Sequence, residues 1–341
     1  MKIAVVTDPG CEDLLKIEND KFVINDFYGE IDFSEAELVN FVYTSQLASR
    51  VLLKTSSGKF KDFDDLLKKI KLIPCNRIRC DRKGLHHFRS VDIQASLENK
   101  KEKGELDFRV IIRDDKFVAG LDLAGRDLSK RQYRVFNHPN NIKGSLAAAA
   151  LYFANAKTPF LDPLGLSGTI AIEMALKESK TSVNYYNKNF DFFKLKNFKP
   201  HENILNKIDE KKIKIKDIHS YDPKFKNLAA QKKNAKIAGV DKFIDFARCE
   251  LSYLDIKHEK INSIVTLPIE PSKKLAEKRA IELNNVLLKQ SSLLLTNDEG
   301  LTLITKKPVF IEKTLTGFEI IDKKKVLQGE VEYYFLKLRR L

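Results

Sequence analysis

From about residue 144 to residue 305, segments with helix-like and strand-like patterns alternate along the chain. Helices are predicted over 144–156, 168–178, 224–238 and 273–294, and short strands over 159–161, 216–221, 243–247, 261–267 and 300–305. Alternation of this length predicts a doubly wound α/β fold with a mostly parallel sheet, whose ligand binds at the carboxyl ends of the strands. An antiparallel pair, 317–324 and 329–338, is expected to close the sheet.

The first 125 residues follow a different pattern. Strands are expected at 2–7, 22–25, 29–33, 76–81, 107–113 and 116–123, and helices at 11–18, 34–47, 62–70 and 91–98. Ser34 followed by Glu37 forms a capping box, which marks the start of the second of these helices. This arrangement predicts a small two-layer α+β region that ends near residue 125.

The charge of the chain is strongly positive and unevenly distributed. Its 341 residues include 61 Lys and Arg against 47 Asp and Glu, which gives a formal net charge of +14. Residues 50–90 contain 12 basic and 4 acidic residues. Concentrated positive charge attracts polyanions through counterion release, and nucleic acid is the commonest such partner. Lys-rich helices that are simply solvated remain an alternative, and acidic phospholipid is a weaker one, because no long basic amphipathic helix stands out.

The cysteines and the lack of targeting segments limit which metal sites and which cellular location we expect. The four cysteines have neither a CxxC pair nor zinc-knuckle spacing, so we expect buried small side chains and no metal site. No apolar run approaches the roughly 18 residues that span a bilayer. The N-terminus reaches a turn too early for a signal peptide. We therefore expect a cytoplasmic protein without a membrane partner.

Three segments carry a family resemblance. They are residues 7–14 (TDPGCEDL), 79–90 (RCDRKGLHHFRS) and 127–134 (DLSKRQYR). Taken in order, they resemble the THUMP-containing RNA guanine-N2 methyltransferases, nearest the archaeal tRNA and bacterial ribosomal RNA enzymes. The resemblance covers nearly the whole chain. It implies a ferredoxin-like region over 1–50, a THUMP domain over 51–125, a linker over 126–143 and a Rossmann-like methyltransferase domain over 144–341.

The resemblance implies tRNA or another structured RNA as the partner. Guanidinium and ammonium groups in the matching segments are suited to phosphate and sugar contacts. His86 is a further candidate because imidazole can stack on a base or ribose, although such a histidine is often a packing or capping residue. The candidate RNA-binding residues are Arg79, Arg82, Lys83, His86, Arg89, Arg126, Lys130, Arg131 and Arg134.

Residues 161–170 (LDPLGLSGTI) lie between a predicted strand and a predicted helix. They resemble the Asp-Pro-x-x-Gly-Ser-Gly-Thr loop of the family, which implies S-adenosylmethionine as the cofactor. Leu166 stands in the place of the first loop glycine, and Gly165 lies one position early. Two acids after later strands resemble the family's ribose-binding and adenine-binding residues, or they are ordinary surface acids. The implied cofactor-binding residues are Asp162, Gly165, Ser167, Gly168, Thr169, Asp222 and Glu250.

The catalytic loop of the family, Asn-Pro-Pro-Tyr, corresponds to Leu267, Pro268, Ile269 and Glu270, of which only Pro268 matches. In the family, carbonyl groups of this loop orient the guanine amino group and the aromatic ring stacks on the extruded base. Two hypotheses follow. The first is a methyltransferase that acts on RNA, with guanine N2 of tRNA as the target. The second is a homologue that has lost activity and acts as an RNA-binding protein. A protein that uses another nucleotide cofactor is disfavoured, because residues 165–168 lack dinucleotide or P-loop spacing.

Overall fold

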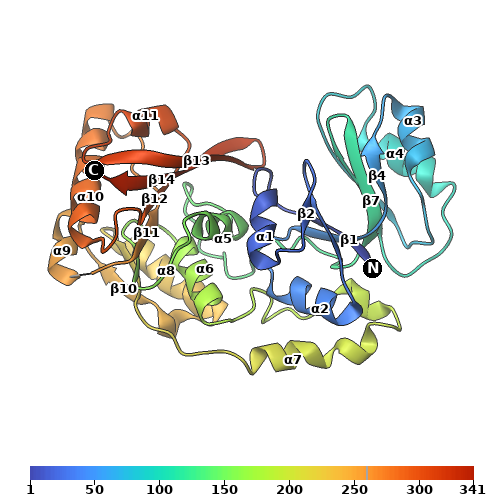
Figure 1. Ribbon diagram of the computed structural model, residues 1–341, viewed down its shortest axis with the longest axis horizontal. Coiled ribbons are helices and arrows are strands. Elements are labelled where there is room, and N and C mark those ends of the chain that lie inside the picture. Colours follow the sequence, from blue (N-terminus) through green and yellow to red (C-terminus); the bar gives the residue numbers. More distant parts are fainter. Residues whose placement is uncertain (259) are drawn as a thin grey trace.

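The computed structural model describes residues 1–258 and 260–341. Its strands form two seven-stranded sheets, which lie on opposite sides of the molecule in Figure 1. The mixed α/β fold predicted from the sequence is confirmed, with the doubly wound part in the second half of the chain.

The first sheet has the strand order β2-β3-β1-β4-β7-β6-β5. All neighbouring strands are antiparallel except β5 and β6, which are parallel. The strands are β1 (Lys2–Val6), β2 (Val23–Ile24), β3 (Gly29–Asp32), β4 (Arg50–Lys59), β5 (Ile78–Lys83), β6 (Phe108–Arg113) and β7 (Lys116–Asp122).

Strand β4 was not predicted from the sequence. It pairs with β1 on one side and with β7 on the other, so one continuous sheet includes strands from both expected N-terminal regions. Only its first half is largely buried, with Val51 and Leu52 inaccessible to solvent. The second half is polar and basic, so the strand lacks the alternation of apolar and polar residues that identifies a half-buried strand in a sequence.

The second sheet has the strand order β10-β9-β8-β11-β12-β14-β13, in which β10 to β12 are parallel and the last two are antiparallel. Its strands are β8 (Phe160–Asp162), β9 (Ile218–Asp222), β10 (Asp245–Arg248), β11 (Ser263–Thr266), β12 (Leu301–Thr305), β13 (Phe318–Gln328) and β14 (Val331–Arg340).

The helices mostly begin and end where local signals place them. Ser34 accepts a hydrogen bond from the Glu37 backbone N–H, and the Glu37 carboxylate accepts one from the Ser34 N–H at 2.9 Å, as the predicted capping box requires. Gly239 ends its helix in a left-handed conformation with φ of 75°. The helix Asn203–Asp209 was not predicted.

The helices are α1 (Leu15–Glu18), α2 (Glu35–Thr44), α3 (Phe63–Lys69), α4 (Ser90–Glu98), α5 (Gly144–Phe153), α6 (Thr169–Glu178), α7 (Asn203–Asp209), α8 (Phe225–Ala238), α9 (Leu254–Lys257), α10 (Glu277–Leu294) and α11 (Pro308–Glu312). In the part of the chain that the structure describes, none of them has the length and apolarity of a membrane-crossing helix. Between the two sheets, α5 and α6 pack together in Figure 1.

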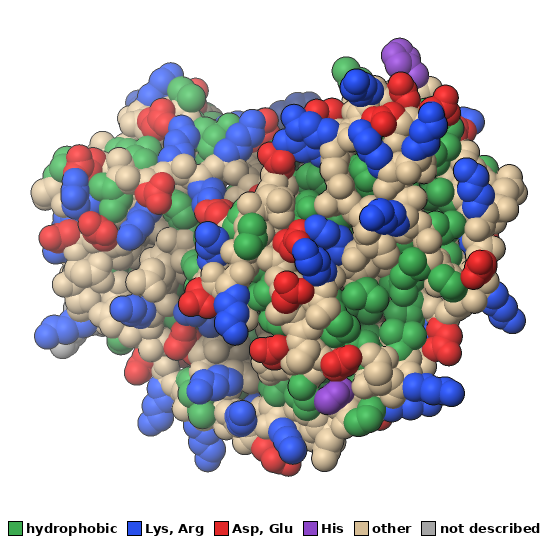
Figure 2. All heavy atoms as spheres, turned by 45° about the vertical axis from the view of Figure 1, so that its right-hand side comes forward, with side chains coloured by type: hydrophobic (Ala, Val, Ile, Leu, Met, Phe, Trp, Pro, Cys, Tyr) green, Lys and Arg blue, Asp and Glu red, His purple; other side chains and the backbone are tan. Residues whose placement is uncertain are grey.

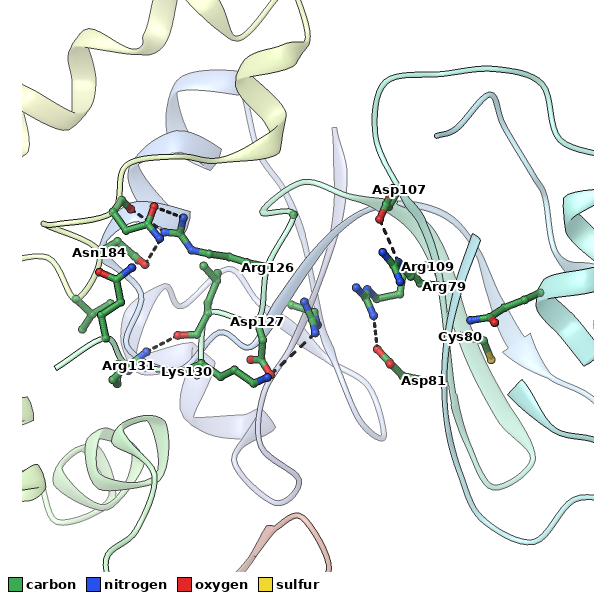
Figure 3. Close-up of a pocket in the computed structure, with 17 residues that line it drawn as sticks. Arg79, Cys80, Asp81, Asp107, Arg109, Arg126, Asp127, Lys130, Arg131 and Asn184 are labelled. Atoms are coloured by element: carbon green, nitrogen blue, oxygen red, sulfur yellow. Dashed lines mark hydrogen bonds and ion pairs between the residues drawn. The ribbon is translucent and has the colours of Figure 1, made fainter. Parts of the chain in front are cut away.

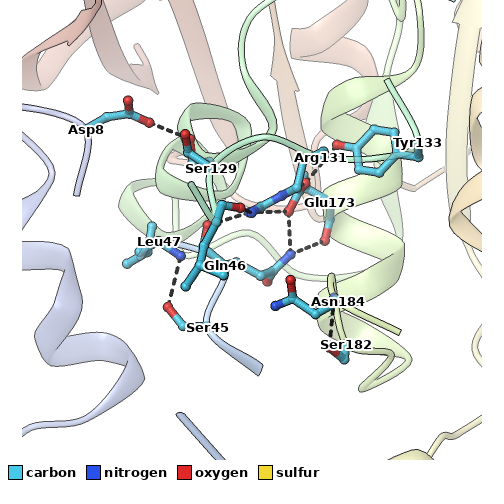
Figure 4. Close-up of polar contacts among 12 residues, drawn as sticks. Asp8, Ser45, Gln46, Leu47, Ser129, Arg131, Tyr133, Glu173, Ser182 and Asn184 are labelled. Carbon is cyan, nitrogen blue, oxygen red and sulfur yellow. Dashed lines mark hydrogen bonds and ion pairs between the residues drawn. The ribbon is translucent and has the colours of Figure 1, made fainter. Parts of the chain in front are cut away.

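A buried polar cluster joins the two halves of the chain (Figure 4). Arg131 Nε donates to Glu173 Oε1 at 2.8 Å, and Tyr133 donates to the same oxygen at 2.8 Å. Gln46 Nε2 donates to Glu173 Oε2 at 2.8 Å, while the Gln46 carbonyl accepts from Arg131. Glu173 is fully buried on α6, whereas Gln46 follows α2. Every oxygen of the Glu173 carboxylate is therefore satisfied by a residue outside its own helix.

The hairpin of β13 and β14 forms a second connection. Leu327 N–H donates to the Pro9 carbonyl at 2.9 Å, and Lys324 pairs with Asp13 at 2.7 Å. The Gln328 side chain accepts from the Lys143 N–H at 2.7 Å. In Figure 1 this hairpin reaches from the second sheet toward the first. These contacts add to the buried polar cluster in joining the two halves of the chain.

We predict that Glu173→Ala lowers the free energy of unfolding by about 3–5 kcal/mol, because it leaves the buried Arg131 charge without its partner. Denaturant unfolding followed by circular dichroism measures this loss. The matched control is Glu178→Ala on the same helix, where the partly exposed pair with Lys177 should contribute less than about 1 kcal/mol. Equal losses in the two variants would contradict a special role for the buried cluster.

Candidate active site

A cavity of about 930 Å³ lies at the carboxyl ends of the parallel strands of the second sheet. The residues that line it follow β8, β9, β10, β11 and β12 in turn, as the doubly wound topology predicts. Representative lining residues from these five positions are Leu166, Asp222, Glu250, Leu267 and Lys306. The walls combine apolar side chains with a few polar ones, which is typical of a site for a small organic ligand.

The loop after β8 has a strained backbone. Leu166 lies in the left-handed region with φ of 50°, a conformation that a branched side chain rarely adopts. Its N–H donates to Asp222 Oδ2 at 3.1 Å, and its side chain lines the cavity. Gly165 is required by close packing, since a Cβ atom there would lie 2.5 Å from Ser220 Oγ. Gly168 has φ of 83° and is the N-cap of α6.

The linker between the two halves holds this loop. Asn141 Nδ2 donates to the hydroxyl groups of Ser167 and Thr169, the second at 2.6 Å. Asn234 Nδ2 donates to the Ser167 carbonyl at 2.9 Å and to the Phe136 carbonyl at 3.0 Å. Ser167 and Thr169 are buried, so these groups position the loop rather than line the cavity.

Asp162 ends β8 and is buried beside the cavity. Its Oδ1 accepts from the Thr266 hydroxyl at 2.7 Å and from the Leu164 N–H at 3.3 Å, whereas Oδ2 has no hydrogen-bond partner among the described residues. Burial raises the pKa of this carboxyl group to about 7. A buried oxygen without a partner, next to Leu164 on the cavity wall, is able to receive a hydrogen-bond donor from a ligand.

Asp222 and Glu250 both line the cavity but differ in their surroundings. Asp222 is 1% exposed, and its carboxylate accepts hydrogen bonds from the Leu166 and Lys224 N–H groups. Asn227 Nδ2 donates to both carboxylate oxygens. Glu250 is exposed, and its carboxylate has neither a hydrogen bond nor an ion pair among the described residues.

The four residues of the expected catalytic loop line the cavity together after β11. Asn284 on α10 holds Ile269 through its backbone, donating to the carbonyl at 2.9 Å and accepting from the N–H at 3.0 Å. Glu270 accepts from the Thr305 hydroxyl at 2.6 Å and from the Lys306 N–H at 2.7 Å. The loop is therefore fixed, and Leu267 presents an apolar side chain to the cavity.

Four of the expected RNA-binding residues line a second cavity, of about 610 Å³, beside the first sheet. They are Arg79, Arg126, Lys130 and Arg131. Figure 3 shows Arg79 and Arg109 approaching it from the sheet, and Arg126 and Lys130 from the linker. Arg79 pairs with Asp107 at 3.2 Å, and Arg131 is turned toward the buried Glu173.

Arg126 differs from its neighbours because it donates to asparagine side chains and carbonyl groups, for example to Asn187 Oδ1 at 2.7 Å. Its guanidinium lies 4.5 Å from the centre of the Phe190 ring. Burial lowers the pKa of Arg126.

The remaining RNA-binding candidates lie outside that cavity. Lys83 and Arg89 are exposed, Arg82 and Arg134 are partly buried, and Arg82 donates to the Gly84 carbonyl at 3.0 Å. His86 packs on the Phe88 ring with 5.0 Å between centres and hydrogen-bonds the Asp114 carbonyl. In Figure 2, Lys and Arg side chains are scattered among acidic ones over the visible face.

Sequence reasoning missed several residues that shape the main cavity. Asn141 and Asn234 hold the loop after β8, Asn284 holds the loop after β11, and His138 and Tyr253 line the cavity. The sequence did contain a signal for Asn234 and Asn284, because an asparagine within a predicted helix, if buried, needs a specific hydrogen-bond partner. All four cysteines are buried, as expected.

The part of the chain that forms this cavity matches a known protein family. Residues 131–332, more than half of the chain, match the family described as an RMKL-like methyltransferase domain (UPF0020). The chain belongs to this family.

Individual relatives of this RMKL-like methyltransferase family extend the comparison. A tRNA (guanine(6)-N2)-methyltransferase from Methanocaldococcus jannaschii is 28% identical over 96% of this chain and 97% of its own length. A ribosomal RNA large subunit methyltransferase K/L from Buchnera aphidicola is 35% identical over 42% of this chain, which is 22% of the relative. A crystal structure described as a methyltransferase complexed with SAH shares the fold, with a TM-score of 0.76, 18% identity and coverage of 100% and 98% of the two chains.

The unusual state of Asp162 leads to a pH prediction. The folded protein holds this proton up to about pH 7, whereas the unfolded chain releases it near the ordinary value of 3.8. The protonated carboxyl group therefore favours folding at low pH, and this contribution is lost as the pH rises from about 4 to about 7.

We expect Asp162→Asn to remove that pH dependence. As the pH is raised from 5 to 8, the free energy of unfolding of the variant should rise relative to that of the wild type, by up to about 3 kcal/mol. Denaturant unfolding of both proteins at the two pH values measures the difference. A constant difference would show that Asp162 titrates normally.

Proposed function

We propose that this chain transfers a methyl group from S-adenosylmethionine to RNA, with a guanine N2 amino group of tRNA as the target. The observation that carries the proposal is the match to the archaeal tRNA (guanine(6)-N2)-methyltransferase over nearly the full length of both proteins. The cavity at the carboxyl ends of the strands supports it, because it lies within the part of the chain that matches the methyltransferase family.

The residues present fit S-adenosylmethionine. Asp162 Oδ2 is buried and has no partner in the described part of the chain, and a carboxylate in that state suits the ammonium group of a methionine moiety. Glu250 lines the cavity with a carboxylate that has no hydrogen bond among the described residues. The cofactor supplies the methyl group. Leu166 and Leu267 add apolar side chains to the walls of the same cavity.

The N-terminal half is proposed to bind the RNA. In this assignment residues 1–50 form a ferredoxin-like region, 51–125 a THUMP domain, 126–143 the linker and 144–341 the methyltransferase domain. Because β4 pairs with strands of both N-terminal regions, they present one surface. The cationic cavity of Arg79, Arg126 and Lys130 borders the linker, which also contacts the loop after β8.

A second candidate function, RNA binding without methyl transfer, is favoured by the loop after β11. The Leu267 side chain has no amide oxygen to accept a hydrogen bond from a guanine amino group. The backbone groups of Ile269 are occupied by Asn284, and Glu270 is held by Thr305.

Methyl transfer to RNA distinguishes the two candidates. We expect the wild type to transfer label from S-adenosylmethionine to a guanine of unmodified tRNA, identified by nuclease digestion and mass spectrometry. Leu267→Asn supplies an amide acceptor and should raise kcat by about tenfold or more. Absence of transfer by both proteins, with tRNA binding intact, would favour the second candidate.

RNA binding itself has a separate test. We expect Lys83→Gln and Lys130→Gln each to weaken tRNA binding and to reduce the slope of log affinity against log salt by about one, because each removes one phosphate contact. Both lysines are exposed, so the fold should be unaffected. Lys289→Gln on α10 removes the same charge from an exposed position elsewhere. Identical salt slopes for all four proteins would overturn the assignment of these lysines.

A further inference from the structure

The helix α8 exposes one side that is basic and partly aromatic. Its opposite side is buried and packs against β9 and β10. Residues 223–240 contain five lysines and no Asp or Glu. The exposed side of the helix carries Phe225, Lys226, Lys232, Lys233, Lys236 and Ile237. We call this side, together with Phe136 of the linker, the α8 face.

The charges of the α8 face are not compensated within the protein. Among the described residues, none of its lysines has an acidic partner at ion-pair distance. By contrast, the three consecutive lysines of β13 are all paired with acids, for example Lys323 with Glu312 at 2.8 Å. A run of lysines in this protein is thus not always left to solvent alone.

The placement of these lysines is also unfavourable for the helix itself. Lys226 lies in the first turn of α8, where a cation opposes the helix dipole. Lys232 and Lys236 are four residues apart, so two like charges lie side by side on the helix surface. A polyanion bound to the α8 face would relieve both kinds of repulsion.

Aromatic rings lie among these charges. Phe136 is 39% exposed, and the Lys233 ammonium lies 4.8 Å from the centre of its ring. The Asn234 side chain accepts from the Phe136 N–H and donates to the Phe136 carbonyl, each at 3.0 Å, so the linker is fixed to the helix at this point. Phe225 is 72% exposed. Basic groups next to exposed rings are typical of surfaces that bind single-stranded nucleic acid, because ammonium groups contact phosphates and rings stack on bases.

The α8 face borders the candidate active site. Lys224, directly before α8, lines the main cavity, and so does His138, two residues after Phe136. In the other direction along the linker, Lys130 lines the second cavity. RNA bound to the α8 face would therefore lie next to the opening of the main cavity.

We propose that the α8 face binds an unpaired segment of the substrate RNA, with its lysines on phosphates and Phe136 stacked on a base, beside the nucleotide that enters the main cavity. RNA is favoured over an acidic membrane because it offers bases as well as phosphates to this face. The inference rests on the proposed function, since it takes RNA as the substrate. It adds a contact surface on the methyltransferase domain to the one proposed for the N-terminal half.

The affinity for unmodified tRNA, measured by fluorescence anisotropy over a range of salt concentrations, tests the role of the charges. The double variant Lys232→Gln/Lys236→Gln should bind about tenfold more weakly at low salt. The slope of log affinity against log salt should fall by about 1.4, because each phosphate contact on a single strand contributes about 0.7. Lys323→Gln/Lys325→Gln removes the same charge from lysines that are paired, and should stay within about twofold of the wild type.

Phe136→Ala tests the stacking contact separately. It should weaken tRNA binding about tenfold without changing the salt slope, whereas Phe136→Tyr keeps an aromatic ring and should bind like the wild type. Single-stranded oligoadenylate should show the same loss in Phe136→Ala, and an RNA duplex should not, because its bases are already stacked. All of these variants should keep the melting temperature and the S-adenosylhomocysteine affinity of the wild type, since the altered side chains are exposed.

The outcomes separate this inference from the proposed function. Unchanged tRNA affinity in both Lys232→Gln/Lys236→Gln and Phe136→Ala would overturn the inference and leave the proposed function standing. Unchanged tRNA affinity together with lost binding to phosphatidylserine vesicles would assign the α8 face to a membrane, and would overturn it too. Weakened tRNA binding in these variants, with no methyl transfer by the wild type, would support the inference and contradict the proposed methyl transfer.

Discussion

The buried carboxylate of Glu173 couples the packing of α6 to the N-terminal half of the chain. It accepts hydrogen bonds from Arg131, Tyr133 and Gln46, which belong to the linker and to the segment after α2. A buried charge is tolerated only when its partners are in place. The position of α6 is therefore linked to that of the first sheet. The loop that precedes α6 is fixed relative to the first sheet in the same way.

The linker transmits this constraint to the candidate active site. Asn141 holds Ser167 and Thr169, Asn234 joins Phe136 to Ser167, and Asp222 holds the strained Leu166. Many side chains in the segments that resemble a cofactor-binding site therefore form hydrogen bonds within the protein. The groups that remain able to contact a ligand include Asp162 Oδ2, which has no partner among the described residues, and side chains of the loops after β10 and β11.

Much of the fold could be predicted from the sequence, because periodic apolar residues and caps such as Ser34 and Gly239 are local signals. Strand β4 could not, since its charged second half lacks a regular alternation and its pairing with β1 and β7 is decided by tertiary contacts. For the site, motif resemblance located the loops. Whether Asp222 is free or fully bonded depends on Leu166, which is 56 residues away in sequence, so no local pattern reports it.

The hairpin of β13 and β14 has a consequence for synthesis of the protein. Lys324 meets Asp13 across 311 positions of the chain. At about 5–20 residues per second, a ribosome needs roughly 15–60 s to make that interval. During this time the N-terminal sheet can fold, but its contacts with the hairpin do not yet exist. The relative orientation of the halves is thus completed only when the last two strands emerge.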